Sequence, residues 1–297
     1  HRMRPRSIAN NNNNNKKKTN RKLNTVQHAK LSILDDGDEQ TWVIDPSLHE
    51  TRVCIGHSFA GTEDVKGEPM MDWVGSHLVH SNDSMTDEDV HPITEDFLYT
   101  TEENQQALSF SVGMPINEAL QNANKNWLVI GQRDGDSNHT LVSAAVVQEF
   151  DPKLEKRKLN NIFSNLGSDW RMLKALVEMS KHEPIPRLFK ESTSSPAGKR
   201  WVEKAMLFET SAKEWHLEVG PTEKHWYVSM VGVHPSVNGQ GYGRRLMEKL
   251  NGLADEQGVL QYLECGERNV KFYEKMGYEL WTRKTVTDPT MPHKESA

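Results

Sequence analysis

The sequence predicts an α/β fold in which helices flank a central sheet, on three observations. The segment "HWYVSMVGV" (225–233) is rich in β-branched and aromatic residues, as expected of a strand. The segment "VLQYLE" (259–264) predicts the next strand. Between them lies a helical pattern whose apolar residues share one face: Leu246, Met247, Leu250, Leu253 and Ala254. Strands and helices that alternate in this way are typical of layered α/β proteins.

The first half of the chain supplies further strands. The segment "TWVIDP" (41–46) predicts a first strand, and Ser47 and Glu50 then stand at capping-box spacing, which predicts a helix start. Two apolar segments, "NWLVIGQR" and "LVSAAVVQEF", flank the polar turn "DGDSNHT". This arrangement predicts two antiparallel strands joined by a turn.

The second half predicts a helical insertion and a last helix and strand. Apolar residues recur at helical spacings between Asp151 and about Trp215, so we expect an insertion over about 151–224. The segment "NVKFYEKM" predicts a short helix that Gly277 ends, and "YELWTRKTV" predicts the closing strand. We therefore predict one domain over 39–285, with core motifs in 225–285, and a flexible tail over 286–297.

The N-terminal segment differs in composition from the rest. Residues 1–30 hold nine Lys and Arg and no acid, which leaves 27 basic against 42 acidic residues in the remainder. The Asn run at 10–15 and the lysines after it predict a disordered tail over 1–38. An organelle transit peptide is the alternative. Because the remaining chain is acidic, we expect no nucleic acid as its partner.

Composition also bears on compartment, membrane and metal. We find no apolar stretch of about 18 residues, so we expect no membrane span. Cys54 and Cys265 are the only cysteines and lie far apart, which favours a reducing, cytoplasmic compartment, with organelle targeting by the basic tail as the alternative. The 13 histidines show no metal-ligand spacing, so we expect no metal. The oligomeric state is left open.

Three alternating glycines in "NGQGYGRRLMEKL" (238–250) lie between a predicted strand and a helix. Such a turn favours an anion, because the first helical amides lack internal partners and the helix dipole is positive there. A P-loop is excluded because no Gly-Lys-Ser or Gly-Lys-Thr follows, and a dinucleotide fingerprint fails at position 244, which is Arg. The third pattern, Gln/Arg-x-x-Gly-x-Gly/Ala, holds the pyrophosphate of acetyl-CoA.

Together, "HWYVSMVGVHPSVNGQGYGRRLMEKL" and "LQYLECGERNVKFYEKMGYEL" resemble the GNAT acyltransferase superfamily, in particular its small-molecule N-acetyltransferases. The resemblance covers about residues 225–285 and is looser around "SFAGTEDVKGEPMMDWV". It implies a mixed, largely antiparallel central sheet flanked by helices, whose two central strands splay apart. Asn238 departs from the family pattern, because Gln or Arg is usual there and Asn is one methylene shorter than Gln.

The resemblance implies where acetyl-CoA binds. The pantetheine arm would lie in the splay, against the backbone of Met230, Val231 and Val233. Asn269 would bond the arm, with a plain helix N-cap as the alternative. Arg244 or Arg245 would add positive charge. The pyrophosphate would meet the turn and first helical amides at Asn238, Gly239, Gln240, Gly241, Tyr242, Gly243 and Arg244.

Tyr273 and Glu264 are the predicted catalytic residues. In the resembling motif a tyrosine faces the thioester sulfur; a core tyrosine beside Phe272 is the alternative. Full proton transfer from a phenol to a thiolate costs about 2 kcal/mol in water, so hydrogen bonding is the more important role. Glu264 would act as the base, since neutralising an amine of pKa near 10.4 at pH 7 costs about 4.6 kcal/mol. An exposed strand-end carboxylate is the alternative.

These residues predict acetyl transfer from acetyl-CoA to the primary amine of a small molecule, by direct attack in a ternary complex. An acyl-enzyme on Cys265 is not required for this reaction. Acetylation of a protein N-terminus or lysine is one alternative. The other is a non-catalytic acyl-CoA sensor, which the departure at Asn238 would favour.

Overall fold

A single mixed sheet forms the centre of the computed structural model, with strand order β2-β3-β4-β5-β6-β1-β7. All neighbouring strands are antiparallel except β5 and β6, which are parallel. This confirms the mixed, largely antiparallel sheet. The strands are β1 (Arg2–Pro5), β2 (Trp42–Ile44), β3 (Trp127–Arg133), β4 (Leu141–Phe150), β5 (His225–Val233), β6 (Gln261–Glu264) and β7 (Tyr278–Leu280). The structure describes residues 2–5, 25–34, 41–60, 112–113, 115–123, 125–135, 140–159, 212–266 and 269–283.

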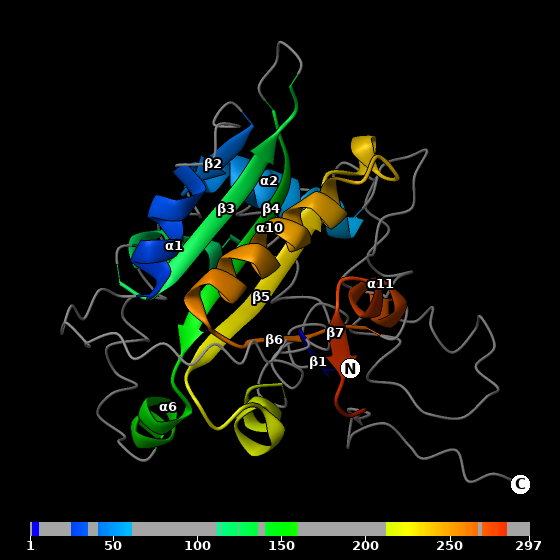
Figure 1. Ribbon diagram of the computed structural model, residues 1–297. Coiled ribbons are helices and arrows are strands. Elements are labelled where there is room, and N and C mark those ends of the chain that lie inside the picture. The colour runs from blue at the N-terminus through cyan, green and yellow to red at the C-terminus, as the bar shows by residue number, and fades with distance from the viewer. Residues whose placement is uncertain are drawn as a thin grey trace, which may run out of the picture.

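Helices cover both faces of the sheet (Figure 1). Helices α1 (Thr25–Leu34) and α10 (Tyr242–Gln257) pack with β3, β4 and β5 on one face, and α2 (Leu48–Ala60) lies on the other. The short helix α11 (Val270–Lys275) lies beside β7, and α6 (Pro152–Leu159) follows β4. Residues 212–219 are also helical and lead into β5.

The core between α10 and the sheet is the one that the sequence predicts. Leu246, Met247, Leu250, Leu253 and Ala254 are all buried on the inner face of α10. The helix ends at Gly258, whose φ of 63° is in the left-handed region that glycine tolerates best. A second cluster of buried residues, including Cys54 and Ile55, lies between α2 and the other face of the sheet.

The predicted disordered tail over 1–38 needs correction. Helix α1 lies inside it and buries Val26, Ala29 and Ile33 in the main core, while Lys30 forms an ion pair with Asp45 at 2.6 Å. The apolar residues of α1 have helical spacing, a pattern that the Asn- and Lys-rich residues before it obscured. Strand β1 pairs with β6 and β7, so part of the first five residues is also structured. The folded unit therefore includes residues 25–34.

Most other predicted elements are confirmed. The capping box is present, since the Ser47 amide donates to Glu50 Oε2 and the Glu50 amide donates to Ser47 Oγ, both at 3.2 Å. Helix α6 and residues 212–219 agree with a helical insertion, whose remaining residues lie outside the described ranges. The closing strand is shorter than predicted, because β7 ends at Leu280. Among the described residues, no helix combines the length and apolarity needed to cross a membrane.

Candidate active site

Strands β5 and β6 separate soon after they pair. Their parallel register holds only at Trp226 with Gln261 and Tyr227 with Tyr262, whereas β5 continues to Val233. Between β4 and β5 the register shifts at Val146 and Val147, where Ser229 has no partner residue in the ladder. Such a bulge increases the local bend and twist of a strand. The second half of β5 therefore has an open edge, which confirms the predicted splay.

The backbone direction along β5 decides which predicted cofactor residues face this gap. The His234 amide donates to the Val142 carbonyl of β4 at 2.7 Å. Because amides alternate along a strand, those of Val231 and Val233 point to the open edge, and we expect the Met230 amide to point to β4. Of the three residues whose backbone is predicted to contact the cofactor arm, Val231 and Val233 thus have amides that face the gap. The side chain of Met230 packs against the cluster beneath α2.

The glycine turn joins the end of β5 to the start of α10. After a short 3-10 helix, η2 (Pro235–Val237), Gly239 and Gly241 have φ values of 78° and 82°. Side chains other than glycine rarely adopt this left-handed conformation. The turn is exposed, and Gly241 is the N-cap of α10. No side chain of Gly239 or Gly241 therefore covers the first backbone amides of α10.

At Gly243 a side chain is excluded by close packing. A Cβ atom there would lie 3.2 Å from Val233 Cγ2 and 3.7 Å from Phe272 Cζ. The missing side chain lets the first turn of α10 come close to β5 and α11. The alternating glycines thus combine two left-handed positions with one close approach of the backbone.

The two arginines after the turn have different partners. Arg244 is exposed and forms an ion pair with Glu248, with 2.7 Å between Nε and Oε1. Arg245 Nη1 donates to the Gln240 carbonyl at 3.2 Å, and its guanidinium lies 4.2 Å above the Tyr242 ring. The charge nearest the turn therefore comes from Arg245, while Glu248 partly neutralises Arg244. Asn238 is exposed at the end of η2.

Tyr273 is buried on α11, between Phe272 and Tyr278, with ring centroids 5.1 and 5.7 Å away. Burial, with a smaller effect of the Cys265 thiol, raises the pKa of Tyr273 well above its usual range. The phenol therefore stays protonated and can donate a hydrogen bond. Its packing also fits the alternative of a core tyrosine. Asn269 precedes the same helix and does not cap it with its side chain.

Glu264 ends β6 on the face of the sheet that α2 covers. Its Oε1 accepts a hydrogen bond of 2.8 Å from the Tyr262 hydroxyl, and the Tyr262 ring stacks on His216 at 4.4 Å. The opposite face of β6 carries Leu263 in the α10 core. The carboxylate is thus held in place beside the splay.

The sequence did not indicate three contacts between α2 and the end of β5. Gly232 lies so close to α2 that a Cβ would be 2.9 Å from Ile55 Cα. Ser58 Oγ accepts a hydrogen bond of 3.1 Å from the Val233 amide, at the open edge. His57 Nδ1 lies 3.2 Å from His234 Nε2. No short motif contains these pairs, because they join residues more than 170 positions apart.

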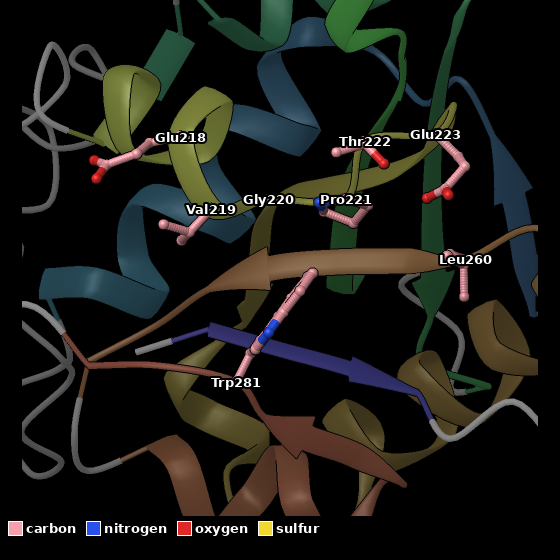
Figure 2. Close-up of a pocket in the computed structure, with 8 residues that line it drawn as sticks. All are labelled: Glu218, Val219, Gly220, Pro221, Thr222, Glu223, Leu260 and Trp281. Atoms are coloured by element: carbon pink, nitrogen blue, oxygen red, sulfur yellow. The ribbon is translucent and has the colours of Figure 1, made fainter.

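A pocket of about 370 Å³ lies at the N-terminal ends of β5 and β6, away from the glycine turn. Figure 2 shows the Trp281 side chain lying across it toward Val219 and Pro221, with the carboxylates of Glu218 and Glu223 on either side. Carboxylates and an indole ring are groups that favour a cation. Within the described ranges, no group of three or more His, Cys, Asp or Glu side chains could hold a metal ion.

Comparison with known protein families shows what this arrangement is similar to. Residues 205–278 match the acetyltransferase (GNAT) family, a stretch that includes the splayed strands, the glycine turn, Glu264 and Tyr273. Over this stretch the chain is similar to GNAT acetyltransferases. This similarity supports acyltransferase activity.

No curated protein matches the chain. Among solved structures, the chain is similar to the polyamine N-acetyltransferase of Drosophila melanogaster, an enzyme that catalyses the formation of N-acetylagmatine. The identity is 13%, the match covers 81% of this chain and 84% of that one, and the TM-score is 0.29.

Proposed function

We propose that this GNAT domain transfers the acetyl group of acetyl-CoA to the primary amine of a small molecule, by direct attack in a ternary complex. One observation carries the proposal. The open edge of β5 leads, through η2, into a glycine turn at the N-terminus of a 16-residue helix. An extended arm that ends in a pyrophosphate fits an open strand edge followed by a positive helix end.

The residues of the turn fit a pyrophosphate. No atom lies within 4 Å of the position that a Cβ would take at Gly239, so the turn is open above the backbone. The amides from Gly239 to Arg244 would hold the phosphate oxygens, and Arg245 would add its charge. The amides of Val231 and Val233 would hold the amide groups of the arm at the open edge. Asn269 remains a proposed contact of the arm.

The proposed chemistry divides between two side chains. The neutral amine attacks the thioester carbonyl, the C–N bond forms, and the C–S bond breaks to release the CoA thiolate, while the nitrogen gives up one proton to solvent. Tyr273 would donate a hydrogen bond to the sulfur as its charge develops, and its raised pKa keeps that proton in place. Glu264 would place a negative charge toward the ammonium form of the acceptor.

The acceptor is proposed to be a small, cationic amine. The carboxylate of Glu264, held beside the splay, supports a cationic acceptor there. Both cysteines that the structure describes are free thiols, which supports a reducing compartment such as the cytoplasm.

Tyr273→Phe tests the proposed reaction. We expect kcat to fall about 10- to 100-fold, because the hydrogen bond to the developing thiolate is lost, with the Kd of acetyl-CoA within about twofold. The measurement is thiol release from acetyl-CoA over a panel of small amines, with binding followed by calorimetry. Tyr278→Phe is the control, since the buried hydroxyl of Tyr278 donates to Gln261 and its loss should affect stability alone.

Equal turnover by Tyr273→Phe and wild type would contradict the role of Tyr273. Binding without turnover on any amine would favour a sensor or a protein acceptor.

Ser58→Ala tests whether the cofactor arm uses the Val233 amide. In the free protein that amide donates to Ser58 Oγ, so the arm has to replace this bond. A net hydrogen bond contributes about 1 kcal/mol, so its loss from the free protein should tighten acetyl-CoA binding about fivefold. Calorimetric titration checks this. Weaker binding by Ser58→Ala would show instead that the hydroxyl itself contacts the cofactor.

A further inference from the structure

The hydroxyl of Tyr242 joins the start of α10 to the hairpin between β3 and β4. It donates a hydrogen bond of 2.9 Å to Asp134 Oδ1. Asp134 follows β3 directly, and its amide donates to the Thr140 carbonyl across the hairpin at 3.1 Å. The side chains of Asp134 and Tyr242 are both half-buried. The tyrosine ring is therefore fixed at two ends, by the backbone of α10 and by the end of the hairpin.

The side chain of Arg245 lies on this ring. Its guanidinium carbon is 4.2 Å from the centroid of the Tyr242 ring, which is a cation–π contact. Arg245 Nη1 also donates to the Gln240 carbonyl at 3.2 Å, and it lies 3.5 Å from the position that a Cβ would take at Gly241. The ring and the carbonyl together place the guanidinium against the glycine turn.

Most of the donors of Arg245 remain available to a ligand. A guanidinium carries several N–H donors in a planar fork, and the contact with Gln240 occupies one of them. Arg245 is exposed, and no carboxylate in the described part of the chain pairs with it. A fork of donors beside the first amides of a helix suits a phosphate group, which accepts bonds from both.

The Tyr242 ring also separates Arg245 from the carboxylate that holds the ring. Asp134 contacts the hydroxyl of Tyr242, and no ion pair joins it to Arg245 among the described contacts of either residue. The arginine is thus held in place without being neutralised. Ordering a long side chain when a ligand binds costs conformational entropy, and stacking on a fixed ring removes part of that cost beforehand.

We propose that Asp134 and Tyr242 are positioning residues that hold the Arg245 guanidinium ready for the pyrophosphate of acetyl-CoA. Arg245 donates to phosphate oxygens that the amides of the turn leave free, while its guanidinium stays stacked on the ring. This unit selects an acyl donor by its phosphates and not by its acyl group. The inference rests on the proposed acetyl-CoA site, and it adds to that site two residues outside the predicted phosphate contacts: the side chain of Asp134 and the hydroxyl of Tyr242.

The contact of Arg245 with the pyrophosphate is tested by Arg245→Gln, in calorimetric titrations of the full chain with CoA and with 3′-dephospho-CoA. Both ligands carry the pyrophosphate, and only CoA carries the 3′-phosphate. We expect both to bind about 10- to 100-fold more weakly, because hydrogen bonds to a charged group are lost. Lys249→Gln is the matched control, since it removes one positive charge one turn further along α10. It should bind both ligands within about twofold of the wild type.

The positioning role is tested by Tyr242→Leu, which removes the ring and leaves Arg245 in place. We expect binding of CoA to weaken about 3- to 10-fold, and Tyr242→Leu to cause no further loss where Arg245→Gln is already present. Asp134→Ala should also weaken binding, because the ring loses its tether. Asp134→Asn should bind CoA at least as tightly as the wild type, since an amide oxygen still accepts from Tyr242 and a negative charge near the pyrophosphate is removed.

The outcomes separate this inference from the proposed function. Wild-type affinity in Arg245→Gln overturns the inference alone, and so does a loss for CoA without a loss for 3′-dephospho-CoA, because Arg245 would then serve the 3′-phosphate. Additive losses in the double variant overturn the positioning role, since they mark a structural role of the ring in the turn. The absence of CoA binding by the wild type overturns both the inference and the proposed function. CoA binding without turnover of any amine overturns acetyl transfer to a small molecule and leaves the inference to be decided by the variants.

Discussion

Replacing Gly241 with valine is expected to weaken acetyl-CoA binding by at least ~100-fold. Gly241 has a φ of 82° and caps α10, so a β-branched side chain there distorts the turn and stands above the first helical amides. Each hydrogen bond to a charged group contributes about 1.5–3 kcal/mol, and the loss of two exceeds the 2.7 kcal/mol that ~100-fold requires. Calorimetric titration with acetyl-CoA measures the change.

Gly252→Ala is the matched control for this variant, because Gly252 lies on an exposed face of the same helix. A Cβ there would have no atom within 4 Å, and its backbone is helical. Alanine should therefore stabilise the protein by about 0.5–1 kcal/mol and leave acetyl-CoA binding unchanged. The strain at Gly241 itself costs about 1–2 kcal/mol, which circular dichroism and thermal melting will detect. Wild-type affinity in folded Gly241→Val would contradict the assignment of the turn.

Replacing Gly232 with alanine is expected to destabilise the protein by about 1–3 kcal/mol, and valine by more. The new Cβ would lie 2.9 Å from Ile55 Cα, a backbone atom of α2, and 3.2 Å from Ser58 Cβ. A backbone atom cannot rotate away, so α2 has to move off β5. This movement would also break the Val233–Ser58 and His57–His234 contacts. Thermal melting should show a drop of several degrees, with reduced turnover.

Gly131→Ala on β3 is the control variant, because its new Cβ would meet a flexible side chain where that of Gly232→Ala would meet a backbone atom. A Cβ there would lie 2.3 Å from Leu141 Cδ1, which is the end of a flexible side chain. Leu141 can change its rotamer, so we expect a smaller loss of stability although the distance is shorter. If Gly232→Ala were as stable as the wild type, α2 would not be packed on β5 as the structure has it.

The elements of the C-terminal half could be predicted closely because each has a local signal. Strand β5 was predicted at its observed bounds, and the five buried residues of α10 and the cap at Gly258 follow from periodicity and glycine conformation. The splay itself came from the family resemblance, and the register of β5 with β6 confirms it. Helix α1 was missed because composition was given more weight than the spacing of its three buried residues.

The contacts around the site could not be predicted, because they depend on tertiary packing. The role of Gly243 as a packing residue requires knowing that Val233 and Phe272 converge on it. Arg245 was given no preference over Arg244, because only the structure shows that Glu248 pairs with Arg244. Likewise, His57 and Ser58 lie in a helix whose sequence carries no motif, and α2 brings them to β5.

Titration of the full chain with acetyl-CoA and with CoA tests the central claim most directly, that the edge of β5 and the glycine turn form a CoA site. We predict one site per chain, with a Kd in the range of about 1 µM to 1 mM that is usual for enzyme substrates, and a large loss of affinity in Gly241→Val. The absence of measurable heat at millimolar acetyl-CoA, from a protein that melts cooperatively, would contradict the account. The glycines of "NGQGYG" would then form only a turn between a strand and a helix.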